Sequence, residues 1–330
     1  METKIAQSAK GIHAVIQKIS LSEYDRIICI SDIHGELDLF KALLKKTGFC
    51  KNDALILIGD LYAKGSQPLE TLEFLSDFVD RSNVYALYGN TDFGMWGYES
   101  DNHKQWLNSL PDIIESENYI FVHDGITSNN LNEQISIRHK KVDAYAENPN
   151  LPKFDKWVIV GHWVTANYCG QVPNYNPFYN YEKQIIAIDG GIALAPAGQL
   201  NALIINNNVE GGDKFSSTYV DNLPSVIIKK AQDMKPGTVN VRLHDRRLPN
   251  FGVNIDVIEK GELLSKIKYK DTELTVPTAM FWKVDGVDII CDCATNHELS
   301  VSIGEEVSVV LAFEDMIYAK QKGFCGWIHL

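Results

Sequence analysis

The fold is decided by the stretch IICISDIHG, residues 27–35. Four apolar residues, long enough for a short strand, precede a serine, the pair Asp32 and His34, and a glycine. Short runs of Ile, Val, Leu and Tyr that stop at glycine are typical of buried strands. The stretch therefore predicts a buried strand that carries Asp32 and His34 just beyond its carboxyl end.

The same pattern, an apolar run closed by a polar residue beside a glycine, occurs five more times. The further runs are ALILIGD (54–60), VYALYGN (84–90), YIFVHDG (119–125), WVIVGH (157–162) and IIAIDGG (185–191). Glycine lets the backbone turn sharply and approach a ligand closely, so side chains at different strand ends can meet at one point. The sequence predicts that six residues meet in this way: Asp32, His34, Asp60, Asn90, His123 and His162.

Segments with helical spacing separate the first three runs. Residues 36–47 place Leu37, Phe40 and Leu43 on one side of a helix, and residues 69–79 repeat the spacing. Strands that alternate with helices predict an α/β layer sandwich.

A change of pattern predicts a second domain. The turn-forming stretch NNNVEGGD, residues 206–213, interrupts the alternation of strands and helices. Short alternating strands are expected beyond it, over 239–243, 253–258, 266–269, 288–293 and 306–313. We therefore expect a catalytic domain over residues 1–212 and a small all-β accessory region over residues 213–330.

The blocks DxHG, GD, GN, VHxGI, GH and IDxG occur in this order between about residues 26 and 203, and the chain thereby resembles the calcineurin-like metallophosphoesterases. It is most similar to their phosphoprotein phosphatase branch, which includes serine/threonine phosphatases and symmetrical diadenosine tetraphosphate hydrolases. The resemblance implies a four-layer αββα sandwich. The tail from Gly304, which includes Gly326-Trp327-Ile328, resembles a bacterial Src-homology-type barrel.

The resemblance also implies a pair of divalent metal ions. Asp32 and His34 would hold the first, Asp60 would bridge both, and the second would be held by Asn90, His123 and His162. A mixed oxygen and nitrogen donor set without thiolate suits manganese, our first choice, or iron, zinc or nickel, and argues against a purely structural zinc site. Such a pair generates a bridging hydroxide that attacks phosphorus, so hydrolysis of a phosphate ester or anhydride is expected.

The chain departs from the family pattern at the general acid. Ala63 stands where the family has an aspartate, and Thr91 where it has the histidine that protonates the leaving group. Without that pair, which typically supplies about 10²–10⁴-fold in rate, a substrate with a good leaving group is favoured: a nucleotide, a phosphodiester or an aryl phosphate. Two alternatives remain open, a metal-binding pseudophosphatase scaffold and a protein phosphatase acting on phosphotyrosine or phosphoserine/threonine.

Two cations are candidates for binding substrate phosphate. Lys64 replaces the family arginine after Asp60, and Arg138 lies where the family has a second one, although a solvated surface role is the alternative for Arg138. We expect a structural role for Asp92. The aromatic stretch 167–181 is expected either to pack over the sheet edge or to bind a nucleobase or tyrosyl group.

Composition narrows the partners. The 330 residues are 45% hydrophobic and carry a net charge of −12, which opposes broad binding to nucleic acid or anionic lipid. No segment approaches the roughly 20 apolar residues of a membrane span, and we expect a cytoplasmic protein. The expected partners are a small phosphorylated or nucleotide substrate or a phosphoprotein, and the β region is expected to bind a protein or to mediate dimerisation.

Overall fold

The computed structural model describes residues 12–79, 81–148, 150, 153–209, 214–242, 253–290 and 293–330. The chain divides into two compact units. The first comprises residues 1–164, 177–194 and 200–221, and the second comprises residues 165–176, 195–199 and 222–330. The expected boundary between residues 212 and 213 falls outside the described residues.

The first unit contains two mixed sheets. The five-stranded sheet has the order β11-β10-β2-β3-β4, with β2 (Arg26–Ile30), β3 (Asp53–Ile58) and β4 (Val84–Leu87) parallel to one another. Strand β10 (Leu200–Asn206) is antiparallel to both of its neighbours, β2 and β11 (Phe215–Val220). The six-stranded sheet has the order β1-β5-β6-β7-β9-β8, formed by Ile16–Lys18, Ile113–Glu115, Tyr119–Val122, Trp157–Val160, Ile185–Ala187 and Phe178–Asn180.

Successive side chains of a strand point to opposite sides of its sheet, and in β2 both sides are covered by a core. Ile28 and Ile30 belong to a core shared with the helices. Ile27 and Cys29 belong to a second core, which also contains Phe121 of β6 and therefore lies between the two sheets. This double burial explains why the first run reads as continuously apolar.

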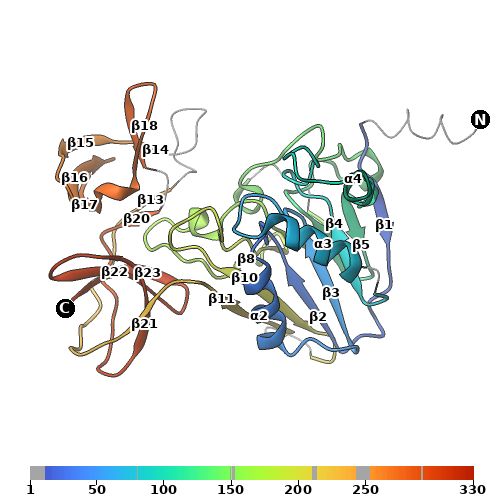
Figure 1. The fold of residues 1–330 in the computed structure, drawn as a ribbon, viewed down its shortest axis with the longest axis horizontal. Coiled ribbons are helices and arrows are strands. Elements are labelled where there is room, and N and C mark those ends of the chain that lie inside the picture. Colours follow the sequence, from blue (N-terminus) through green and yellow to red (C-terminus); the bar gives the residue numbers. More distant parts are fainter. Residues whose placement is uncertain are drawn as a thin grey trace, which may run out of the picture. The chain divides into compact units, whose positions relative to one another are not determined.

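Three α-helices are described in the first unit: α2 (Leu37–Thr47), α3 (Pro68–Phe78) and α4 (Asp101–Ser109). Phe40, Leu72 and Leu107 bring all three into the core shared with β2 and β3, and Figure 1 shows α2 and α3 lying across that sheet. The predicted α/β layer sandwich is confirmed. The three described α-helices pack in the core of the five-stranded sheet, and the short 3-10 turn η2 (Tyr145–Glu147) lies beside β9 of the six-stranded sheet.

None of the helices in the described ranges is both long and apolar enough to span a membrane.

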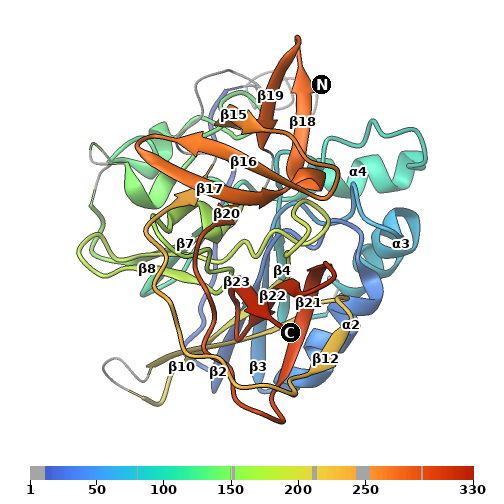
Figure 2. The same ribbon diagram turned by 90° about the vertical axis from the view of Figure 1, so that its left-hand side faces the viewer.

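The second unit consists of antiparallel strands, as the sequence predicted. Its largest sheet has the order β12-β21-β22-β23, formed by Ser225–Ile227, Glu306–Ala312, Met316–Gln321 and Phe324–His329. The smaller sheets are β15-β16-β17 (Asp256–Glu259, Leu264–Tyr269, Thr272–Pro277), β14-β19-β18 (Val253–Asn254, Val287–Ile290, Phe281–Val284) and β13-β20 (Asn240–Val241, Ala294–Thr295). Figure 2 shows the β15–β17 sheet and the β21–β23 sheet as separate groups of this unit. The likeness to an Src-homology-type barrel stays a prediction.

Two loops from the middle of the chain belong to this second unit. Lys320 of β22 is buried, and its ammonium group donates to the carbonyl oxygens of Ala197 (2.9 Å) and Gly198 (3.2 Å). Asn240 likewise donates to the carbonyl oxygens of Ala166 (3.0 Å) and Cys169 (2.9 Å). Buried polar groups need such partners, so these bonds fix the two loops to the late strands.

Candidate metal centre

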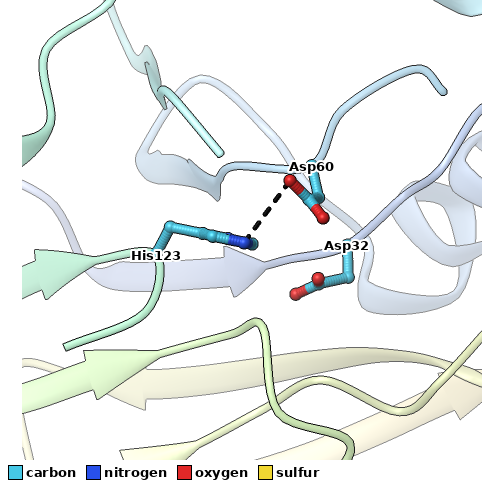
Figure 3. Close-up of side chains that lie close together, drawn as sticks. All are labelled: Asp32, Asp60 and His123. Carbon is cyan, nitrogen blue, oxygen red and sulfur yellow. Dashed lines mark ion pairs between the residues drawn. The ribbon is translucent and has the colours of Figure 1, made fainter. Parts of the chain in front are cut away.

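The predicted residues gather where the strands of the first unit end. Asp32 follows β2, Asp60 follows β3 and His123 follows β6. Their side chains are almost fully buried, and Figure 3 shows the Asp60 carboxylate facing the His123 imidazole, with the Asp32 carboxylate close by. The ligand atoms of these three residues lie within 4.8 Å of one another, which is close enough to share a cation.

The backbone around the site is held in an unusual conformation. Asp32, His34, Asp60 and His162 have φ angles of 53°, 48°, 52° and 65°, in the left-handed region that favours glycine. Such residues cost about 1–3 kcal/mol each and cluster at functional sites. Hydrogen bonds between the loops after β2 and β3 hold it, with Asp32 N–H donating to Gly59 O (3.0 Å) and His34 N–H to Asp60 O (2.9 Å).

A first group of ligand atoms surrounds His34. Its Nε2 lies 3.8 Å from Asp32 Oδ1 and 3.6 Å from Asp60 Oδ2. Its Nδ1–H donates to the Ala63 carbonyl oxygen (3.1 Å), which leaves the lone pair of Nε2 facing the two carboxylates. Asp32 Oδ1 and His34 Nε2 are buried and have no hydrogen-bond partner. Since buried polar atoms almost always have one, these atoms fit a metal ion.

A second group lies on the other side of the same aspartate. Asp60 Oδ1 is 3.4 Å from His123 Nε2, which is 3.1 Å from Asn90 Oδ1. The Nδ1–H of His123 donates to the Ile58 carbonyl oxygen (2.8 Å) and fixes the ring. Asp60 thus presents one carboxylate oxygen to each group.

Burial and mutual attraction set the ionisation of these groups. Burial raises the pKa of Asp32 to about 6 and lowers the pKa of His34 to about 4. Burial also opposes the charged forms of Asp60 and His123, but their attraction outweighs it: the pKa of Asp60 falls to about 2 and that of His123 rises to about 9. A cation held by His123 therefore has to displace a proton from it.

His162 lies beside His123, with ring centroids 5.3 Å apart, but its Nε2 faces a carboxylate that the sequence analysis did not single out. Asp143 Oδ1 is 2.9 Å from this nitrogen, and the backbone N–H of His162 donates to Asp32 Oδ2 (3.0 Å). Nδ1 is thus the ring nitrogen that His162 can offer to a cation, with Asp143 orienting the ring. Asp143 lies 19 positions away in a stretch without periodicity, so no sequence signal indicated it.

The residues at the two altered family positions are both buried. Ala63 and Thr91 offer neither an imidazole nor a carboxylate, and the Thr91 N–H instead donates to Asp60 Oδ1 (2.8 Å). The Asp92 carboxylate accepts hydrogen bonds from the backbone N–H groups of Leu61 and Gly89, each with a length of 2.9 Å. Asp92 therefore has the structural role expected of it, tying the loop after β4 to the loop after β3.

The two candidate phosphate-binding cations differ in their surroundings. Lys64 is exposed, and its charge contributes to lowering the pKa of His34, for which burial is the larger cause. Arg138 donates to Asp112 Oδ1 (2.7 Å) and to the Leu110 carbonyl oxygen (3.1 Å), with its guanidinium 3.7 Å from the centre of the Tyr88 ring. Their roles in phosphate binding stay predictions.

The aromatic stretch 167–181 is largely taken up by packing. Tyr168 and Tyr175 are buried, and Tyr179 stacks on Tyr181 with ring centroids 5.8 Å apart. Packing, the first of the two expectations for this stretch, accounts for the buried Tyr168 and Tyr175, whereas Tyr181 is 62% exposed.

Comparison with known proteins gives one family match. The sequence profile described as "Calcineurin-like phosphoesterase" matches residues 25–190, half of the chain.

Individual relatives are more distant. The chain is 34% identical over 99 residues to the symmetrical bis(5'-nucleosyl)-tetraphosphatase of Buchnera aphidicola subsp. Acyrthosiphon pisum, covering 28% of this chain and 35% of that protein. It is 27% identical over 158 residues to the protein of the same name from Vibrio campbellii, covering 39% and 58%. These matches thus span about a third to somewhat over half of the relatives' lengths. A serine/threonine phosphatase structure from Saccharomyces cerevisiae aligns over 68% of this chain and 87% of its own, with 12% identity and a TM-score of 0.46.

Proposed function

The chain belongs to the calcineurin-like phosphoesterase family, a family of metal-dependent hydrolases, and from that premise we propose that it hydrolyses a phosphate ester or anhydride with two divalent metal ions. Manganese is the ion we expect first, with iron, zinc or nickel as the others that suit the donor set. The proposed substrate has a good leaving group, and a nucleotide is the class we favour.

The observation that carries this proposal is the position of Asp60. One of its carboxylate oxygens is 3.6 Å from His34 Nε2 and the other is 3.4 Å from His123 Nε2. A carboxylate with one oxygen toward each of two imidazoles is arranged to bridge two cations. His34 and Asp32 would hold one of them, and Asn90, His123 and His162 would hold the other.

The proposed chemistry divides between the ions and the chain. When bound, two divalent ions activate water and stabilise the charge that develops on the phosphoryl oxygens. The Thr91 N–H donates a hydrogen bond of 2.8 Å to the shared carboxylate of Asp60 and holds it in place. The exposed ammonium group of Lys64, four positions after Asp60, is the chain's candidate for binding a phosphate oxygen.

The buried Ala63 and Thr91 support a substrate whose leaving group needs no proton. Alanine cannot transfer a proton, and an alcohol is too weak an acid to act as a general acid near neutral pH. A phenolate or a nucleotide phosphate leaves without such help, whereas a serine alkoxide does not. The symmetrical tetraphosphatases among the relatives are named for an anhydride substrate of this kind.

The test is hydrolysis of para-nitrophenyl phosphate, its bis ester and diadenosine tetraphosphate by Mn²⁺-loaded protein, with bound metal counted by mass spectrometry. Asp60→Asn is the control, because it removes the shared charge while keeping the size of the side chain. We expect two ions per chain in the wild type and loss of turnover in the variant. Turnover that survives Asp60→Asn would refute the proposed centre.

Two further outcomes would select the alternatives. Faster hydrolysis of phosphotyrosine or phosphoserine peptides than of any nucleotide would favour a protein phosphatase. Two bound ions with no turnover of any of these compounds would favour the pseudophosphatase scaffold.

A further inference from the structure

Two aromatic rings lie exposed together in the loop that joins Asn90 to α4. Phe93 and Trp96 are 43% and 41% exposed, and their rings stack with centroids 5.2 Å apart and planes at 25°. Met95, between them in the sequence, is 79% exposed. Single exposed apolar residues are ordinary, but a group of large ones beside a candidate site marks a surface that binds something.

The indole of Trp96 is connected to the metal centre through one residue. Its Nε1–H donates to the carbonyl oxygen of Thr91 (2.9 Å), and the N–H of Thr91 donates to Asp60 Oδ1 (2.8 Å). The only polar atom of the indole is therefore used on the protein side. What the exposed part of the ring offers to solvent is an apolar π surface.

A second tie fixes the same loop from the other end. The Glu99 carboxylate accepts hydrogen bonds from the backbone N–H groups of Trp96 (3.0 Å) and Gly97 (3.0 Å) and from the hydroxyl of Tyr62 (2.7 Å). Tyr62 is buried and lies two positions after Asp60. The rings are thus held in place before any ligand arrives, which lowers the entropy lost on binding.

We propose that Phe93 and Trp96 form a stacking platform that binds the nucleobase of a nucleotide whose phosphate lies at the metal centre. This inference rests on the proposed phosphoesterase function and assigns the residues that would bind the base of its nucleotide substrate. A nucleotide has an anionic end and a planar aromatic end. The chain offers a matching pair, since the loop after Asp60 carries Lys64 and the loop tied to it through Tyr62 and Glu99 carries an uncharged π surface.

The platform should accept different bases. Every base has a π face, and with the indole N–H bonded to Thr91 the platform has no hydrogen-bond donor of its own with which to read a base edge. We therefore expect adenine and guanine nucleotides to bind with similar affinity, and the loss of the base to matter far more than its identity.

The probes are adenosine 5′-monophosphate and ribose 5-phosphate, which carry the same phosphate and differ in the base. Their dissociation constants are measured by calorimetry with the Mn²⁺-loaded chain of 330 residues. Where a probe is hydrolysed, the ratio of kcat/KM values replaces the ratio of dissociation constants. We expect the adenine compound to bind about 5- to 150-fold more tightly, which corresponds to the roughly 1–3 kcal/mol that stacking contributes per base.

The double variant Phe93→Ala/Trp96→Ala should bring this ratio close to one, and Trp96→Ala alone should lower it by less because the Phe93 ring remains. Trp96→Phe should retain most of the ratio because both ring faces remain. Gln105→Ala, at an exposed position of α4 outside the aromatic group, is the control and should leave the ratio unchanged. Equal binding of the two probes by the wild type would overturn the platform. So would a Trp96→Ala variant that weakens both probes equally, because the loop would then serve only to support the metal centre.

The inference and the proposed function fail separately. A protein that hydrolyses phosphoesters but binds both probes equally refutes the platform alone. A protein that prefers the adenine compound but turns over nothing refutes the enzyme alone.

Discussion

Replacing Gly89 by alanine tests whether the centre depends on the close approach of two loops. A Cβ atom built on Gly89 would lie 2.8 Å from the carbonyl carbon of Gly59 and closer still to the backbone nitrogen and Oδ1 of Asp60. Side-chain Cβ atoms do not approach other atoms to less than 3.0 Å, and these neighbours are mostly backbone. The loop after β3, with Asp60, and the loop after β4, with Gly89, therefore have to move apart in Gly89→Ala.

The size of the effect follows from this contact. Overpacking a filled site costs about 1–3 kcal/mol, and about 2–4 °C in Tm per kcal/mol is expected for a unit of this size, so Tm should fall by roughly 2–12 °C. A displacement of about 1 Å at a catalytic centre costs on the order of 10²-fold in rate. We therefore expect kcat/KM for diadenosine tetraphosphate to fall about a hundredfold and the count of bound Mn²⁺ to drop below two.

The assays are a thermal melt, metal counting and steady-state kinetics on the same preparation. Gly170→Ala is the matched control, because nothing lies within 4 Å of a Cβ there. A Gly89→Ala variant with unchanged Tm, unchanged kcat/KM and two bound ions would refute the view that the geometry of Asp60 depends on this approach.

Three further substitutions give separable results. Arg138→Ala should lower the free energy of unfolding by about 1–3 kcal/mol, because Asp112 loses a charged donor; a rise in KM at unchanged stability would instead support the phosphate-binding role. Lys64→Gln should leave Tm unchanged and raise KM for an anionic substrate about tenfold, with weaker dependence on salt; an unchanged KM would exclude contact with phosphate. Burial alone would raise the pKa of Asp53, but the Arg26 guanidinium holds this pKa below its ordinary value. The pair therefore stabilises the fold fully above about pH 3.9, and this stabilisation is lost as the pH falls through the lowered pKa. Arg26→Met should therefore flatten the rise in stability below about pH 4 in urea unfolding, and an unaltered rise would contradict this assignment.

The sequence predicted the part of the site that depends on short-range pattern. Asp32, Asp60 and His123 each follow a buried strand, and the end of a strand fixes where the next residue lies. The helix expected over residues 36–47 is α2 (Leu37–Thr47), because its apolar spacing reflects the face that it buries. These inferences need no knowledge of distant contacts.

Features that depend on distant contacts were not predictable in the same way. Asp143 meets His162 from a loop 19 positions earlier. The bonds from Trp96 to Thr91 and Glu99 are short-range, but they lie in a loop whose sequence has no periodicity to indicate them. Strand β22 (Met316–Gln321) was not among the predicted strands, and the folded chain buries its Lys320 against two carbonyl groups. The sequence shows the charge of such a residue but not the hydrogen-bond acceptors that compensate for its burial.

The hydrogen bonds that hold the two mid-chain loops also determine when these loops can finish folding during synthesis. Asn240 follows its partner Ala166 by 74 residues, and Lys320 follows Ala197 by 123. At about 5–20 residues per second on the ribosome, the second loop waits roughly 6–25 s for its lysine to be made. A fragment that stops at residue 212 would contain every residue of the candidate metal centre. It would lack Asn240, which donates to the carbonyl oxygens of Ala166 and Cys169 shortly after His162, and it would lack Lys320.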